Sequence, residues 1–153
     1  MSNDFDKTAN ELQASIMEDA QKVYSEKVIE RWLNPRNLGK IRNPDGFAKI
    51  KGPCGDTMQV SFKVKDGRLS KIEFKTDGCA SSIASGSMAT ELAKGKKVQE
   101  ALKISQQLIL DALDGLPEES VHCALLASNT LEEAIKNYFD SKRNDPVEQR
   151  NKE

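Results

Sequence analysis

Five side chains in this sequence have the chemistry to share one metal site: three cysteines, one histidine and one aspartate. Cys54 and Asp56 lie in a Gly-Pro-Cys-Gly-Asp loop, Cys79 follows Asp-Gly, and His122 and Cys123 are adjacent. Thiolates and an imidazole suit tetrahedral Zn²⁺, or iron with bridging sulfide. The intervals of 25 residues from Cys54 to Cys79 and 43 from Cys79 to His122 differ from the close cysteine pairs of zinc fingers. We therefore expect an open, labile site that the fold assembles from distant segments.

The same residues also have structural interpretations. A free cysteine is often a buried core residue, and a lone histidine is more often structural than a ligand. Against this, Cys54 lies in a rigid loop, Cys79 begins a helix, and Cys123 neighbours the single histidine near another helix start. Asp56 has two interpretations, and the residues alone do not decide between them. It is either a turn residue beside glycine or a hard carboxylate that receives iron and keeps a cluster removable.

Helix geometry favours reactive and exchangeable ligands at two of these positions. A thiol at a helix N-terminus, as expected for Cys79, is favoured in the thiolate form that binds metal. His122 and Cys123 point about 100° apart around a helix. Both reach one metal ion only if the helix end faces it, or if one ligand replaces the other. This favours ligand exchange over a permanent cage.

The strands that must position these ligands are predicted from alternation of apolar and polar residues. Short strands are expected over 47–51, 58–65 and 71–75, with Met58, Val60, Phe62 and Val64 on the buried face of the middle one. A strict two-residue turn at 66–67 would place Lys71 opposite Phe62 and pair a charge with the core. We therefore expect a five-residue loop over 66–70, or a bulge near Leu69.

Helical spacing of apolar residues predicts helices before and after these strands. One helix or two occupy 10–33 and end before Pro35, and a helix follows Cys79 and stops at Gly95. A short helix and a longer one follow to residue 113. Another helix starts at Glu118, and a final one is re-capped at Asn129 or Thr130. The predicted fold is α+β, with a small three-stranded antiparallel sheet packed against about five to six helices.

Composition and charge limit the classes of function. The chain has 153 residues, 37% of them hydrophobic, a net charge of −1 and three cysteines. It has no basic stripe for nucleic acid, no apolar run that would span a membrane and no signal peptide, so a cytoplasmic location is expected. The odd, widely spaced cysteines argue against a disulfide framework. We expect an N-terminal extension over 1–23, partly helical or disordered, a domain over 24–140 and a polar tail over 141–153.

Several of these segments together resemble the IscU/NifU-type iron–sulfur cluster scaffold. The resemblance covers about residues 24–139 and is carried by five stretches: Tyr24–Ile29, Asn34–Gly39, Cys54-Gly55-Asp56, Asp77–Ser85 and Val121–Ala127. It implies an α+β scaffold on which a cysteine desulfurase deposits sulfur and iron is added. A transient [2Fe–2S] cluster is then passed to apo iron–sulfur proteins or carrier proteins. The protein would be a carrier and not an enzyme.

The resemblance also assigns roles to individual residues. Cys54, Cys79 and Cys123 match the family cysteines that bind the cluster, His122 matches the site histidine, and Asp56 matches an aspartate associated with cluster lability. Cys123 is expected to accept the first persulfide. Zn²⁺ is expected to occupy the same ligands when iron and sulfide are absent.

Two departures from the family pattern concern its partners. The family's chaperone-recognition segment reads Leu-Pro-Pro-Val-Lys, whereas this chain has Leu116-Pro117-Glu118-Glu119-Ser120, which argues against binding of an Hsp70-type chaperone. The extension over 1–23 is expected to pack on the domain or to mediate homo-oligomer formation.

Two other functions compete with the scaffold. One is a zinc-binding sulfur acceptor of the SufU type that activates a desulfurase. The presence of His122 and the absence of an insertion between the second and third ligand segments favour the scaffold instead. The other is a zinc-stabilised interaction module, which would unfold on chelation and accept no sulfur.

Overall fold

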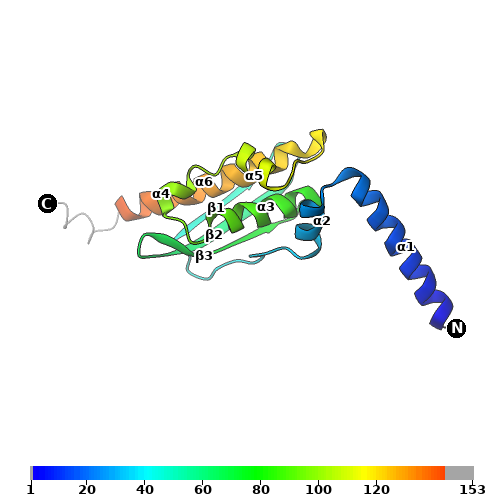
Figure 1. Ribbon diagram of the computed structural model, residues 1–153. Helices are drawn as coiled ribbons and strands as arrows, with labels where there is room; N and C mark the ends of the chain where they lie inside the picture. The colour runs from blue at the N-terminus through cyan, green and yellow to red at the C-terminus, as the bar shows by residue number, and fades with distance from the viewer. Residues whose placement is uncertain (1, 144–153) are drawn as a thin grey trace.

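The structure, a computed structural model, describes residues 2–143 and has the predicted α+β architecture (Figure 1). Its elements follow one another as α1 (Ser2–Val23), α2 (Glu26–Leu33), β1 (Gly46–Lys51), β2 (Thr57–Lys65), β3 (Arg68–Thr76), α3 (Ala80–Ala93), α4 (Val98–Ala101), α5 (Gln106–Ala112), the 3₁₀ turn η1 (Glu118–Ser120) and α6 (Val121–Arg143). Among these residues, no helix combines the length and apolar character needed to cross a bilayer.

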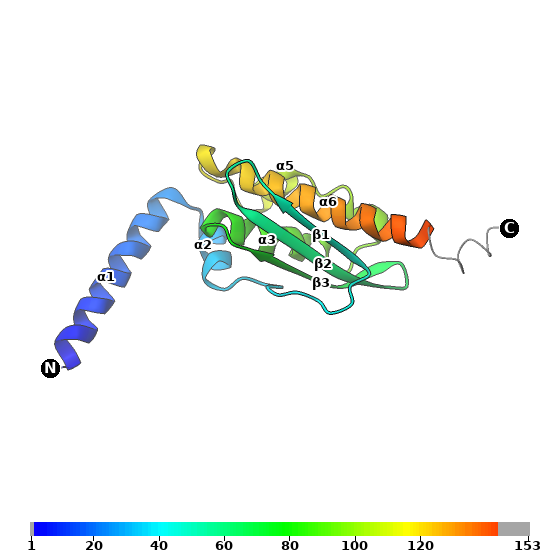
Figure 2. The same ribbon diagram turned by 180° about the vertical axis from the view of Figure 1, so that it is seen from behind.

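The three strands form one antiparallel sheet in the order β1-β2-β3. Helices α3 and α6 lie against one face of this sheet and α5 packs on these two helices, while the other face is open in the reverse view (Figures 1 and 2). The core forms between the two layers, where the inward residues Met58, Val60, Phe62, Ile72 and Phe74 are at most 1% exposed. The alternating pattern therefore predicts the strands and most of the buried face correctly, although Val64, which is also predicted to face inward, is only half-buried.

The β2–β3 hairpin corrects the expected five-residue loop. Its turn has only two residues, Asp66 and Gly67, both at positive φ, and Lys65 pairs with Arg68. A bulge restores the register: Val64 pairs with Leu69 but Lys63 pairs with Lys71, so Ser70 is the extra residue that the strand pairing leaves out. The predicted alternative, a bulge near Leu69, is confirmed. One extra residue keeps the apolar side chains on the core face without a long loop.

The N-terminal region forms two helices separated at Tyr24 and Ser25. The Ser25 hydroxyl caps α2 by accepting a hydrogen bond from the Val28 N–H at 3.2 Å. In both views α1 extends away from the sheet and from the helices that cover it (Figures 1 and 2). The break arises because a serine that caps its own downstream helix adopts extended backbone.

The expected division of the last helical segment at Asn129 or Thr130 is wrong, because α6 is continuous from Val121 to Arg143. The Thr130 hydroxyl bonds back to the Leu126 carbonyl at 2.7 Å and does not cap a new helix. The predicted tail begins inside this helix, since 141–143 belong to α6, and its remaining residues, 144–153, lie outside the described part of the chain.

Helix α3 is built mainly from small residues and approaches the sheet closely. A Cβ added at Gly86 would lie 2.4 Å from the Phe74 ring, so glycine is required for this contact. The apolar residues predicted to face inward behave unequally: Met88 is buried, whereas Ile83 and Leu92 are only half-buried. Close backbone approach, more than large side chains, fixes the position of the helix that carries Cys79 at its start.

Candidate metal centre

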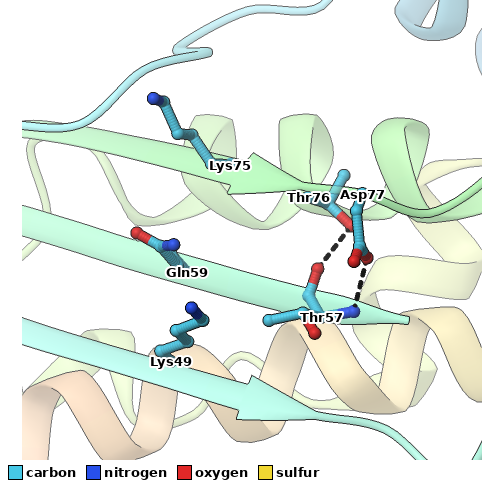
Figure 3. Close-up of a pocket in the computed structure, with 6 residues that line it drawn as sticks. All are labelled: Lys49, Thr57, Gln59, Lys75, Thr76 and Asp77. Atoms are coloured by element: carbon cyan, nitrogen blue, oxygen red, sulfur yellow. Dashed lines mark hydrogen bonds between the residues drawn. The ribbon is translucent and has the colours of Figure 1, made fainter. Parts of the chain in front are cut away.

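The candidate ligands lie together at one end of the sheet, where β1 and β3 end and β2 begins. Two hydrogen bonds join β2 to the end of β3: Thr57 N–H donates to Asp77 Oδ1 at 2.7 Å, and Thr76 Oγ1 donates to the Thr57 carbonyl at 2.8 Å (Figure 3). These bonds lie beside a hollow of about 260 Å³ on the open face of the sheet, lined by Lys49, Thr57, Gln59, Lys75, Thr76 and Asp77. They fix the backbone immediately before Gly78 and Cys79.

The loop between β1 and β2 presents Cys54 to solvent. Gly52 N–H donates to the Asp56 carbonyl at 2.7 Å, and Gly55 N–H donates to the Gly52 carbonyl at 3.0 Å. Gly55 has a φ of +93°, a conformation that side-chain-bearing residues rarely adopt. The result is a tight turn that holds Cys54 and Asp56 at its tip, as the Gly-Pro-Cys-Gly-Asp run predicts.

Asp56, Cys79 and Cys123 come together from three separate segments. One carboxylate oxygen and the two Sγ atoms all lie within 4.8 Å of one another. Cys79 is the N-cap residue of α3, and Cys123 lies in the first turn of α6. Donor atoms at these separations can contact one common metal ion.

His122 completes the group by reaching the remaining cysteine. Its Nε2 lies 3.1 Å from Cys54 Sγ and 3.7 Å from Cys123 Sγ. The start of α6 therefore faces the site, which is one of the two arrangements that allow adjacent residues to contribute together. All five predicted side chains thus converge, with Cys54 and Cys79 exposed and Cys123 only 1% exposed.

Ser82 is a member of this site that the sequence analysis did not identify. Its buried hydroxyl donates to Asp56 Oδ2 at 2.9 Å and lies 3.4 Å from Cys123 Sγ. Ser82 follows Cys79 by three residues and so lies on the same face of α3, which was the available signal. The hydroxyl links the carboxylate to the buried thiol and holds both toward the site.

Gly78 makes room for this pair. A Cβ added at Gly78 would lie 2.5 Å from Ser82 Oγ and 2.7 Å from Asp56 Oδ2. Any larger residue would displace the hydroxyl or the carboxylate. The glycine before Cys79 therefore determines how closely Asp56 approaches the thiols.

The environment of Cys123 favours its neutral thiol in the absence of metal. The pKa of Cys123 is raised to about 11, mainly by burial of the thiol and further by the negative charges of Cys79, Asp56 and Cys54, while the hydrogen bond from Ser82 opposes this rise. A metal cation would reverse this balance, because it replaces the thiol proton and offsets the neighbouring negative charges.

Comparisons with known proteins identify the family of this chain. The family described as "NifU-like N terminal domain" matches residues 23–145. The "Iron-sulfur cluster assembly scaffold protein IscU 1" of Archaeoglobus fulgidus is 50% identical over 118 residues, which cover 76% of this chain and 77% of that protein. The "Iron-sulfur cluster assembly scaffold protein IscU" of Escherichia coli K12 is 44% identical over 120 residues, or 75% of this chain and 93% of that one.

The fold also has a counterpart among solved structures. The N-terminal part of a nitrogen-fixing NifU-like protein from Brucella abortus superimposes with a TM-score of 0.62 at 20% identity, covering 77% of this chain and 95% of that one. This likeness shows the arrangement of the sheet and helices.

Proposed function

The chain belongs to the family of NifU-like N-terminal domains, and we propose that it is a scaffold on which iron–sulfur clusters are assembled and from which they are released. One observation supports this most directly: Asp56, Cys79 and Cys123 place their donor atoms within 4.8 Å of one another, with Cys54 and His122 alongside. The curated relatives are named as iron–sulfur cluster assembly scaffold proteins, and the match covers most of their length. The protein would act as a carrier and not as a catalyst.

The number of donors suits a removable [2Fe–2S] cluster. Such a cluster takes four terminal protein ligands, two on each iron. This site offers five candidates: Cys54, Asp56, Cys79, His122 and Cys123. A fifth donor allows one ligand to leave as another binds, and a hard carboxylate binds iron less persistently than a thiolate does. Asp56 and His122 are therefore the ligands we propose to exchange.

Sulfur would arrive from a cysteine desulfurase as a persulfide. We propose that the Cys123 thiolate attacks the outer sulfur of that persulfide, which forms the new S–S bond, breaks the original one and leaves the donor cysteine as a thiolate. Because Cys123 is 1% exposed, the Cys54 loop or the first turn of α6 must move for this attack. Apo iron–sulfur proteins or carrier proteins would receive the finished cluster.

Zinc would occupy the same donors in the absence of iron and sulfide. Three thiols and one imidazole are a common ligand set for tetrahedral Zn²⁺. Bound zinc would protect the thiols from oxidation until it is displaced.

The test is anaerobic reconstitution with iron, cysteine, a desulfurase and a thiol reductant, which supplies the two electrons that convert each persulfide sulfur to sulfide. Visible absorption and iron and sulfide analysis follow. Wild-type protein should develop charge-transfer bands, and Cys54→Ala, Cys79→Ala and Cys123→Ala should lose most of them. Ser128→Ala is the matched control, because its hydroxyl bonds only to the Leu125 carbonyl of its own helix. Wild-type protein that stays colourless would reject the proposal.

A further inference from the structure

Helix α1 carries an apolar stripe that nothing in the described structure covers. Phe5, Leu12, Ile16 and Val23 are 75%, 62%, 52% and 55% exposed, respectively. Together with Ala9 and Ala20 they fall within about 80° of the helix circumference, at 100° per residue. A continuous stripe of this kind is the surface that an amphipathic helix buries against a partner.

The chain's own domain does not provide that partner. In both views α1 points away from the sheet and its covering helices (Figures 1 and 2). The described side chains of α1 contribute nothing to the buried core.

A membrane surface is also a poor match. Over residues 5–23 α1 carries more acidic than basic residues: Asp6, Glu11, Glu18 and Asp19 against Lys7 and Lys22. Helices that lie on anionic bilayers carry the opposite balance, since lysine and arginine bind the lipid headgroups. The occupant must therefore be an apolar surface of a protein.

We propose that α1 pairs antiparallel with α1 of a second copy of this chain. A two-fold interface requires a patch that complements itself, so that residue i contacts j and j contacts i. The large stripe residues meet this requirement if the two-fold axis passes beside residue 14. Each helix then places Phe5 opposite Val23, and Leu12 opposite Ile16, of the second copy. In each contact, a residue from the N-terminal half of one helix would face a residue from the C-terminal half of the other.

Asp19 determines the direction of the pairing. In heptad terms the stripe alternates between two positions, with Phe5, Leu12 and Asp19 at one and Ala9, Ile16 and Val23 at the other. A parallel pair in register would place Asp19 against Asp19 of the second copy inside the contact. An antiparallel pair instead places Asp19 opposite Ala9, where the carboxylate reaches solvent past a small side chain. Like-charge repulsion thus disfavours the parallel arrangement.

The predicted interface is modest in size. A helix of 22 residues is about 33 Å long. Two such helices paired over their full length would bury on the order of 1,200 Å² in total, which is the lower end for specific interfaces. We therefore expect a reversible dimer whose mass depends on concentration. The two domains would lie at opposite ends of the helix pair, so each metal site would remain separate.

The experiment measures the mass of the full chain by sedimentation and light scattering from low micromolar to several hundred micromolar concentration. Wild-type protein should approach twice the 17.0 kDa chain mass as concentration rises. Leu12→Glu and Ile16→Lys should each weaken dimer formation about tenfold or more, because each buries an unpaired charge. Glu11→Ala, on the opposite side of α1, is the control and should dimerise like the wild type.

Combining the two substitutions tests the direction. In an antiparallel pair, the carboxylate introduced at position 12 faces the ammonium introduced at position 16, so Leu12→Glu/Ile16→Lys should regain dimerisation that salt weakens. In a parallel pair the same variant brings like charges together. Wild-type protein that stays monomeric at every concentration would overturn the proposal, as would a double variant no better than either single one. Because α1 lies outside the core, all variants should bind zinc as the wild type does, whether or not the scaffold function holds.

Discussion

The Nε2 atom of His122 lies 3.1 Å from the Sγ atom of Cys54, although the two residues are 68 positions apart in the chain. One comes from the start of α6 and the other from the loop between β1 and β2. Their contact joins the loop that carries Cys54 to the first turn of α6 at the end of the sheet. The same imidazole lies 3.7 Å from Cys123 Sγ, so it can pair with either thiol and is well placed for ligand exchange.

Removing the carboxylate of Asp56 should lengthen the life of a bound cluster. In Asp56→Ala the hard oxygen donor is lost and the thiolates keep the iron, so we expect release to a chelator to slow by about threefold or more. The measurement is the decay of visible absorption after anaerobic reconstitution. Glu132→Ala, which removes a carboxylate from the exposed side of α6, should release its cluster at the wild-type rate. A shorter cluster lifetime in Asp56→Ala would contradict this role for Asp56.

Removing the hydroxyl of Ser82 should make Cys123 less reactive. The hydrogen bond from Ser82 lowers the pKa of Cys123, so Ser82→Ala should raise that pKa further. A hydrogen bond to a charged group contributes about 1.5–3 kcal/mol, so alkylation of Cys123 near pH 8 should slow about tenfold or more. The rate is followed for this cysteine alone by peptide mass mapping of the metal-free protein. Ser82→Thr keeps a hydroxyl and should restore most of the rate, whereas equal rates in all three proteins would exclude the role.

The metal-free protein should lose stability between about pH 9 and pH 11. Burial raises the pKa of Cys123 from 9.0 to about 11, so the unfolded chain releases this proton before the folded chain does. The stabilisation is therefore complete below pH 9 and is lost as the pH rises towards 11. It amounts to about 2–3 kcal/mol at most.

Urea unfolding at a series of pH values measures this loss. Other groups titrate in the same range, so the informative quantity is the difference between wild type and Cys123→Ala. That difference should shrink as the pH rises, and a constant difference would show that the thiol ionises equally in both states.

Filling the space beside Phe74 should destabilise the domain. The Cβ introduced by Gly86→Ala would lie 2.4 Å from the Phe74 ring, and overpacking of this kind costs about 1–3 kcal/mol. Helix propensity alone would favour alanine, so the sign of the change reports the contact. Urea unfolding checks it, with Asn129→Ala at an exposed position of α6 as the control. Increased stability in Gly86→Ala would show that α3 shifts freely against the sheet.

The sequence by itself determined the strands, most helix boundaries and the identity of the five candidate ligands. Alternation along 58–64 predicts both β2 and its buried face, because side chains on a strand have a period of two. Turn chemistry around Gly55 predicts the loop that presents Cys54. Each of these features depends on residues within a few positions of one another, so local physical chemistry is sufficient.

Only the tertiary structure decided how distant segments meet. The sequence left a long loop and a bulge both open for the β2–β3 hairpin, and only the structure shows that the bulge at Ser70 is used. The continuity of α6 past Thr130 follows from packing along its whole length. The hydrogen bond between Ser82 and Asp56 joins two segments 26 residues apart. No local pattern encodes it, because it requires the close approach at Gly78 and the burial of Cys123 that long-range packing alone produces.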